Sequence, residues 1–401
     1  METLEKRTSE SLTQNLMMAV GHSEHIDPIE ACKNIFTQIN NKLNGMSPDA
    51  GIIYMNIEED QKTVLHEVKK KWPNMELIGC STCGEISSGY GYADDLIALV
   101  VFKSDILDIV VGIGKEASKD INKACAQAVE EIKSKTNKPI KLCFVLPESL
   151  TTSAEDIIDI LNQNFGGETP IFGGTSSDNF TLTGTNQYYN NEVLSDSVPI
   201  IAFAGDLVMS YGVGCGWNPI GKMGIITKSD KNIVYEINKK SALSFYQDLL
   251  GKELELTGEY FLAIFDENDE VSYMRFPMYY NYEDGSIAFA ANVPEGSKIK
   301  ITITNRESIL NGCEQSINNA YNNFPKDAEL AGSLVVSCAG RKSMLGSKVK
   351  NEYDIIKSVI KEDIPILGFY GYGEIATKYT PTNIPQFHNG NFISLLLGTK
   401  I

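Results

Sequence analysis

Long apolar segments, basic residues and histidines are scarce in this sequence. No apolar run reaches the roughly 18–20 residues that a membrane-spanning helix requires. Lys and Arg number 35 against 52 Asp and Glu, and the resulting net charge of -17 opposes binding to nucleic acid or to an anionic membrane surface. The N-terminal stretch is polar and lacks the apolar core of a signal peptide. We therefore expect a cytoplasmic protein that binds neither nucleic acid nor membranes.

Cysteine occurs at eight positions, but not at the spacing of a zinc site or a disulfide framework. Cys80 and Cys83 form a Cys-x-x-Cys pair, and no second pair completes the four ligands of a structural zinc site. The residues after Cys83 lack the helical pattern that follows a thioredoxin-like thiol pair. Phosphate-binding loops and sets of nucleophile, base and orienting residue are not visible either. An enzyme that uses Cys80 or paired carboxylates is kept as an alternative to a binding function.

The strongest pattern present is a turn that occurs three times. In each copy a short apolar run ends at a glycine, namely Gly79, Gly173 and Gly368, and small or polar residues follow. The pattern is typical of a buried strand that stops at a backbone turn. The first and third copies continue into a Gly-Glu pair at Glu85 and Glu374. Three copies of one element predict a single binding site made by a repeated unit.

The segments around these turns predict a mixed α/β (α+β) fold in which an α-β-α-β-β-β unit occurs three times. The predicted amphipathic helices span residues 28–43, 61–72, 119–134, 153–164, 308–323 and 352–360. Short alternating strands and one helix at 241–250 predict an inserted, mainly antiparallel α+β module. The expected organisation is an N-terminal arm (1–26), a domain with units one and two (27–216), and a domain (217–401) with the inserted module (217–305) and unit three (306–401).

Four segments resemble the signatures of the FIST family. Residues 79–86 are similar to the signature turn of the FIST N domain, and residues 338–341, 368–375 and 387–389 are similar to FIST C signatures. The resemblance implies a sensory domain of signal transduction that binds small molecules such as amino acids. Because no kinase, cyclase or F-box segment is recognisable, it implies a stand-alone sensor. Its output partner, such as a kinase, a cyclase or a chemotaxis component, would then be a separate protein.

The turns and the FIST-like signatures supply the candidate ligand-binding residues. These are Cys80, Ser81, Thr82, Glu85, Gly173, Gly174, Ser177, Asp178, Asn179, Arg341, Phe369, Tyr372, Glu374 and His388. Arg341 suits a ligand carboxylate, or forms a surface ion pair. Glu85 and Glu374 suit an ammonium or amide group of a ligand, or hold the backbone of their own turns.

His388 is the histidine of greatest interest, because it belongs to one of the FIST-like signatures. It could contact a ligand, or it could hold a loop in place. Some bacterial relatives are described as haem proteins that sense nitric oxide. A haem-based gas sensor with His388 as an axial ligand is therefore the main alternative, and no other metal site is expected.

Overall fold

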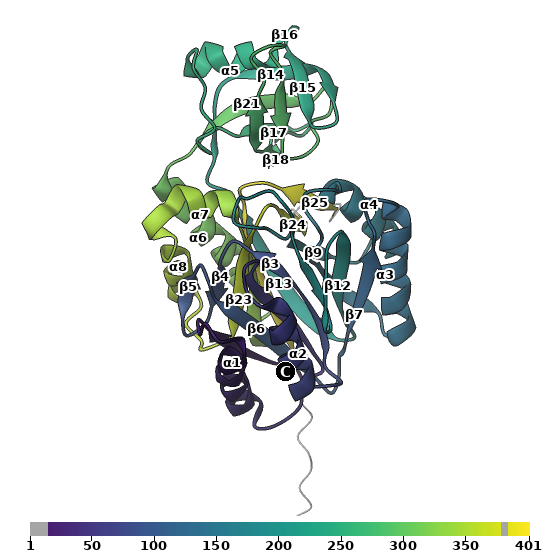
Figure 1. Cartoon of the computed structure of the whole chain (residues 1–401). Coiled ribbons are helices and arrows are strands. Elements are labelled where there is room, and N and C mark those ends of the chain that lie inside the picture. Colours follow the sequence, from purple (N-terminus) through teal and green to yellow (C-terminus); the bar gives the residue numbers. More distant parts are fainter. Residues whose placement is uncertain (1–14, 378–383) are drawn as a thin grey trace, which may run out of the picture.

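The computed structural model describes residues 15–377 and 384–401, which form a body of three repeats with an additional module at one end (Figure 1). The greater part of the predicted N-terminal arm, residues 1–14, lies outside the described residues. Across the described ranges, no helix is both long and apolar enough to cross a membrane.

The three repeats share one order of elements: strand, helix, strand, helix, strand, hairpin and closing strand. The first contains β1 (Met17–Ser23), α1 (Pro28–Leu43), β2 (Ala50–Asn56), α2 (Gln61–Lys71), β3 (Glu76–Thr82), β4 (Glu85–Ser87), β5 (Gly91–Ala93) and β6 (Ile97–Lys103). The second contains β7 (Asp108–Lys115), α3 (Ile121–Lys135), β8 (Ile140–Val145), α4 (Ala154–Asn164), β9 (Ile171–Gly174), β10 (Gln187–Tyr189), β11 (Glu192–Leu194) and β12 (Ser197–Ala204).

The third repeat is split by the module and carries one additional helix. It contains β13 (Leu207–Gly214), α6 (Arg306–Asn323), β22 (Ala328–Cys338), α7 (Ala339–Leu345), a short 3-10 turn (Gly346–Lys348), α8 (Asn351–Val359), β23 (Ile366–Gly371), β24 (Glu374–Thr377), β25 (Pro385–His388) and β26 (Phe392–Lys400). The predicted α/β fold of three repeats is confirmed. The strand that the sequence places last in units one and two begins the next repeat instead, because β7 pairs with β12 and β13 pairs with β26.

Each repeat gives its hairpin to the sheet of another repeat. The sheets have the strand orders β1-β6-β2-β3-β10-β11, β7-β12-β8-β9-β24-β25 and β13-β26-β22-β23-β4-β5. In each sheet the central pair is parallel (β2 with β3, β8 with β9, β22 with β23), and the other pairs of neighbouring strands are antiparallel. The exchange is cyclic, so it brings the carboxyl ends of β3, β9 and β23 to one place.

The sheets enclose a shared core, and the helices cover their outer faces (Figure 1). Rings from different repeats meet in this core. The Tyr54 and Phe369 ring centroids lie 4.6 Å apart, and those of Phe102 and Phe203 lie 5.1 Å apart. Helix α1, which the sequence predicts, illustrates the outer layer. Its buried residues recur every four positions, and Asp27 caps its first N–H groups.

The module is an antiparallel sheet with one helix and its own apolar core, which confirms the prediction for this segment. It contains β14 (Asn218–Asp230), β15 (Ile233–Ile237), β16 (Lys240–Ser241), α5 (Ala242–Leu250), β17 (Leu262–Phe265), β18 (Val271–Arg275), β19 (Pro277–Tyr280), β20 (Ile287–Phe289) and β21 (Lys298–Ile303). Figure 1 shows it beyond the end of the body near β24 and β25.

Two elements differ from the sequence-based predictions. Strand β1 lies within the predicted arm, so the arm assignment is wrong for Met17–Ser23. This strand pairs along its whole length with β6. It was not predicted from the sequence because it ends in the polar residues His22 and Ser23. Helix α7 was not predicted, because it is only seven residues long and follows β22 without a loop.

Candidate functional site

The three repeated turns meet and are joined by hydrogen bonds. Ser81 Oγ donates to the Ser177 carbonyl oxygen (2.8 Å), and Ser177 Oγ donates to the Tyr370 carbonyl oxygen (3.0 Å). The Tyr370 N–H donates to the Gly84 carbonyl oxygen, and the Cys83 N–H donates to the Tyr370 carbonyl oxygen, both at 2.9 Å. The turns therefore form one continuous unit at the end of the body that faces the module.

The first residue of each exchanged hairpin holds the backbone at the start of a closing strand. Glu85, Gln187 and Glu374 each accept a hydrogen bond through a side-chain oxygen. The donors are the N–H groups of Leu96 (3.2 Å), Ser197 (3.2 Å) and Asn391 (2.7 Å). In the second repeat, the residue equivalent to the two glutamates is thus Gln187. The sequence does not reveal this equivalence, because a long loop separates Gln187 from the turn at Gly173. These contacts give Glu85 and Glu374 the structural role left open in the sequence.

A cavity of about 450 Å³ lies between the joined turns and the module, a volume suited to a small molecule. The module contributes aromatic and apolar side chains, Phe261, Phe276 and Met278 among them. The body contributes the hydroxyl-rich residues 149–153, and the turns contribute Thr175 and Tyr372. The module also contributes the polar residues Lys231 and Asn232, so apolar and polar side chains line the cavity from both parts.

An ion pair docks the module on the body beside this cavity. The Arg275 guanidinium at the end of β18 pairs with Glu155 at the start of α4, and the Arg275 side chain is 1% exposed. Arg275 also donates to the Phe387 carbonyl oxygen (3.1 Å), and Glu155 accepts the Asn292 N–H (2.9 Å). Glu155 and Asn292 themselves line the cavity, so anything bound there lies next to the docking contact.

Most of the predicted site residues are buried and do not line the cavity. Of the predicted set, Tyr372 lines it. Fully buried side chains that do not line it are Cys80, Ser81, Thr82, Glu85, Ser177, Asp178, Arg341, Phe369, Glu374 and His388. Gly173 and Gly174 are needed for close packing: a Cβ on Gly173, which has φ +142°, would lie 1.9 Å from the Val145 carbonyl oxygen. Asn179 is half-buried in a left-handed conformation beside Phe180, which does line the cavity.

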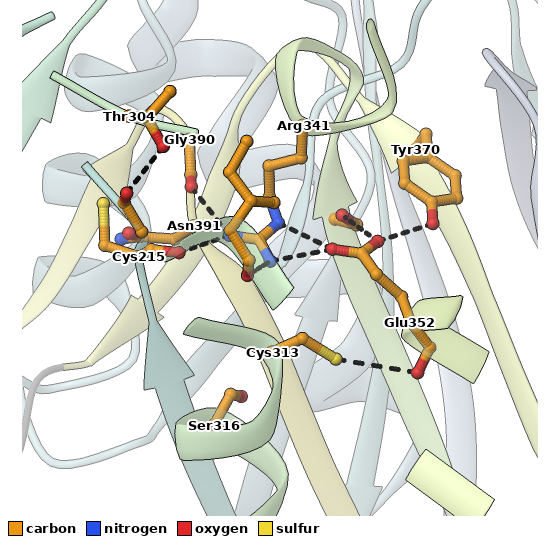
Figure 2. Close-up of polar contacts among 12 residues, drawn as sticks. Cys215, Thr304, Cys313, Ser316, Arg341, Glu352, Tyr370, Gly390 and Asn391 are labelled. Carbon is orange, nitrogen blue, oxygen red and sulfur yellow. Dashed lines mark hydrogen bonds and ion pairs between the residues drawn. The ribbon is translucent and has the colours of Figure 1, made fainter. Parts of the chain in front are cut away.

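Arg341 is neither a surface residue nor a residue of the cavity wall. Its five N–H groups point to Glu352 Oε1 and to the carbonyl oxygens of Ile309, Gly390 and Cys215 (Figure 2). Although burial opposes the charged form, Glu352 raises the pKa of Arg341 above its usual value. Every donor is therefore used inside the protein, and none is left for a ligand carboxylate.

Asp178 organises the loop that leads from the middle turn to the wall of the cavity. Its carboxylate accepts the N–H groups of Thr183 (2.8 Å) and Gly184 (3.1 Å) and the hydroxyl of Tyr372. Burial acts to raise the pKa of Asp178, but the hydrogen bonds, led by that from Tyr372, outweigh it and lower the pKa. The Tyr372 hydroxyl also accepts the Phe180 N–H (2.6 Å), which fixes both rings at the cavity.

The surroundings of His388 do not fit a haem ligand. The imidazole is fully buried, and Nε2 lies 3.2 Å from the Ala376 carbonyl oxygen. His388 lines neither the first cavity nor a second one of about 530 Å³, which lies between the module and α6. The ring is therefore buried and belongs to the wall of neither cavity.

Cys80 and Cys83 are unfavourable nucleophiles. Both are free thiols buried from solvent. Burial, with a smaller contribution from Glu85, raises the pKa of Cys80 well above its usual value, and burial also raises the pKa of Cys83. The cysteine that does line the first cavity is Cys338, at the junction of β22 and α7.

The sequence-based site prediction missed the module's aromatic residues and residues 149–155. Phe261 and Phe276 belong to strand-like segments that resemble ordinary core strands. The run Ser149-Leu150-Thr151-Thr152-Ser153 does carry a signal, because four hydroxyl side chains precede an amphipathic helix at the carboxyl end of a strand. The strand ends were predicted correctly, but the elements that cover them were not.

The fold and the turns define a three-repeat α/β protein with a ligand-sized cavity at its strand ends. Residues 49–240 match the FIST N domain, and residues 242–377 match the FIST C domain. The chain belongs to the FIST family, whose domains are associated with sensory signal transduction and small-ligand binding.

Three individual proteins show similarity to this chain. An uncharacterized protein of Methanocaldococcus jannaschii is 24% identical over 373 residues, which cover 83% of this chain and 70% of that protein. A cyanuric acid hydrolase from A. caulinodans aligns with 96% of this chain and 100% of its own at a TM-score of 0.39 and 8% identity. A chorismatase aligns with 96% of this chain and 99% of its own at a TM-score of 0.37 and 6% identity. Similarity at this level carries no functional conclusion.

Proposed function

We propose that this protein is a cytoplasmic sensor that binds a small ligand in the cavity between the joined turns and the module. The observation that carries the proposal is that both parts of the molecule build the walls of one ligand-sized cavity. A ligand bound there contacts the body and the module at the same time. Its binding energy therefore depends on how the two parts are placed, which is the requirement for a ligand-driven conformational change.

The walls favour a ligand with an apolar part and at least one polar group. Phe261, Phe276 and Met278 present an apolar surface. Among the lining residues from the body, Ser149 Oγ and Thr175 Oγ1 are buried and have no hydrogen-bond partner among the described residues. Such hydroxyls lose free energy unless a ligand or water pairs with them. An amino acid with an apolar side chain, or a similar small metabolite, meets both requirements.

The docking contact between Arg275 and Glu155 would transmit the signal. It lies at the edge of the cavity and holds β18 against α4. Ligand binding would change the position of the module relative to α4 and thereby alter a surface recognised by a separate output protein, such as a kinase, a cyclase or a chemotaxis component. No observation at His388 favours the haem alternative.

Fluorescence of Trp217 tests this function. The chain has two tryptophans, and Trp217 stacks on the cavity residue Phe261 with 4.4 Å between ring centroids. Trp72→Phe removes the other tryptophan and keeps an aromatic ring beside Phe36. Titration of this variant with a panel of amino acids and related metabolites should give a saturable change in emission for at least one compound class. If the whole panel leaves both emission and melting temperature unchanged, the proposed function is refuted.

A further inference from the structure

The second cavity, of about 530 Å³, has no part in the proposed function. It lies between the module and α6, and its volume suits a small molecule. Ser308, Asn311 and Gln315 line it and recur at helical spacing, so one polar face of α6 forms its wall on the body. The turn between β17 and β18 and the first half of β18 form its wall on the module.

The module places two carboxylates at this cavity. Asp266 and Glu270 belong to the turn between β17 and β18, and both line the cavity. The Asp266 N–H donates to the Glu270 carbonyl oxygen (2.9 Å), and Asp266 Oδ1 accepts the N–H groups of Asn268 (2.9 Å) and Glu270 (3.0 Å). These bonds fix the turn and hold both residues at the same end of the hairpin. Among the described residues that line the cavity, none is basic, so the wall favours a cation.

The body adds a buried acceptor that is independent of these carboxylates. Gln386 of β25 lines the same cavity, and its Oε1 atom is buried without a hydrogen-bond partner among the described residues. A buried amide oxygen of this kind loses free energy unless a donor pairs with it. The module and the body therefore both favour an occupant that donates hydrogen bonds.

An organic cation matches this wall better than a metal ion does. Within the part of the chain that the structure describes, no group of three or more His, Cys, Asp or Glu side chains could hold a metal ion. An ammonium group brings its own three N–H donors and needs no such cage. Trp217 and Met274 also line the cavity and offer surface to methylene groups, and the indole ring of Trp217 attracts cations.

We propose that the second cavity is a separate binding site for a small aliphatic diamine. Its ammonium groups donate hydrogen bonds to the carboxylates of Asp266 and Glu270 and to Gln386 Oε1. The occupant contacts the module and the body together, so it stabilises the arrangement in which the module lies against α6. The two cavities share no lining residue, and the inference therefore does not depend on the ligand of the first cavity.

Isothermal titration calorimetry of the full-length protein with putrescine tests this site. At about 0.15 M salt, which screens general attraction to the acidic surface, one putrescine should bind per chain. 1,4-Butanediol and succinate, which have the same number of carbon atoms, should not bind. Asn311→Arg brings a cation to the cavity wall and should weaken binding about tenfold or more. Asn319→Arg is the matched control, because it adds the same charge to an exposed position of α6 outside the cavity.

A second pair of variants tests the carboxylates and remains informative if Asn311→Arg does not fold. Glu270→Gln should weaken binding about threefold, as expected for the loss of one exposed ion pair. Glu267→Gln changes an exposed carboxylate of the same turn that does not line the cavity, and should bind putrescine as the wild type does. The absence of saturable binding, or equal affinities within either pair of folded variants, overturns the proposal.

Gly340→Leu separates this inference from the proposed function, because Gly340 lines the first cavity. Unchanged putrescine binding by this variant supports a separate site. Loss of putrescine binding would place the diamine in the first cavity and overturn the inference. Failure of the metabolite panel, with putrescine binding intact in the wild type and in Gly340→Leu, would refute the proposed function alone.

Discussion

Arg341 and Glu352 form a salt bridge with 2.7 Å between Nη2 and Oε1, and both side chains are 0% exposed. The pair joins α7 to α8, and Glu352 Oε2 accepts the hydroxyl of Tyr370 (2.6 Å) in the third repeated turn (Figure 2). The ion pair thus ties the strand ends beneath the cavity to the helices that cover the third sheet. Because both side chains are fully buried, each charge depends on its partner for electrostatic stabilisation.

Arg341→Met should destabilise the protein by about 3–5 kcal/mol, because the substitution leaves the Glu352 carboxylate buried without its partner. Urea unfolding followed by circular dichroism measures the change. The matched control is Lys33→Met, which removes an exposed cation from its pair with Glu30 and should leave the unfolding midpoint unchanged. Equal midpoints for both variants would show that the buried network is unimportant.

Arg275→Met should loosen the module from the body. The substitution removes the ion pair with Glu155 and the hydrogen bonds to the carbonyl oxygens of Asn292 (2.8 Å) and Phe387. Hydrogen exchange of the Asn292 N–H, which is bonded to Glu155, should become faster by about tenfold or more. Lys298→Met, which removes an exposed pair with Asp269 on the module surface, is the control and should leave this exchange unchanged. Identical exchange in Arg275→Met and the wild type would contradict the assigned docking role.

Glu374 should make stability depend on pH. Burial is the largest cause that raises the pKa of Glu374, to about 8, while the Asn391 N–H, the Cys338 thiol and Arg341 act to lower it and Glu352 acts to raise it. The folded protein therefore holds a proton that the unfolded chain releases above its ordinary pKa of 4.5. The stabilising effect of this proton is present below pH 4.5 and is lost as pH rises to about 8.

Glu374→Gln tests this linkage, because glutamine does not titrate. The difference between the melting temperature of the variant and that of the wild type should increase as pH rises from 4.5 to about 8. Above that value the difference should be constant. A constant difference in melting temperature at all pH values would contradict a raised pKa.

The repeats could be predicted from the sequence because their signals are local. Helix α1 shows its buried stripe in the spacing of Ala31, Ile35, Ile39 and Leu43, and the strand ends show their glycines. The hairpin exchange could not be predicted, because β4, β10 and β24 are three or four residues long and pair with strands far away in the sequence. The length of such a strand and its alternation of apolar and polar residues carry no information about the distant strand with which it pairs.

For the candidate site, the sequence predicts that the three repeated turns converge. The hydrogen bonds from Ser81 to Ser177 and from Ser177 to Tyr370 join these turns, as expected for equivalent turns of a repeat. The sequence does not reveal which face of each turn is covered. Arg341 was a candidate ligand contact because an arginine near the end of a strand suits a ligand carboxylate. The sequence does not reveal its buried partner, Glu352, because that residue lies on a helix with an amphipathic pattern.

A leucine at position 340 tests most directly whether the cavity is the binding site. Gly340 lines the cavity, and a Cβ there would lie at ordinary contact distance, 3.5 Å from Cys338 Sγ and 3.8 Å from Phe261 Cζ, so the side chain fits at the backbone and then fills the cavity. A Cβ on Gly184 meets nothing within 4 Å, which makes Gly184→Leu the matched control.

Both substitutions are placed in the Trp72→Phe background, and Trp217 emission is titrated with the compound that gave the largest response in the metabolite panel. The account predicts that Gly340→Leu loses the saturable response while its melting temperature stays close to that of the parent, and that Gly184→Leu titrates as the parent does. An unchanged titration in Gly340→Leu would contradict the assignment of the cavity as the site of ligand binding.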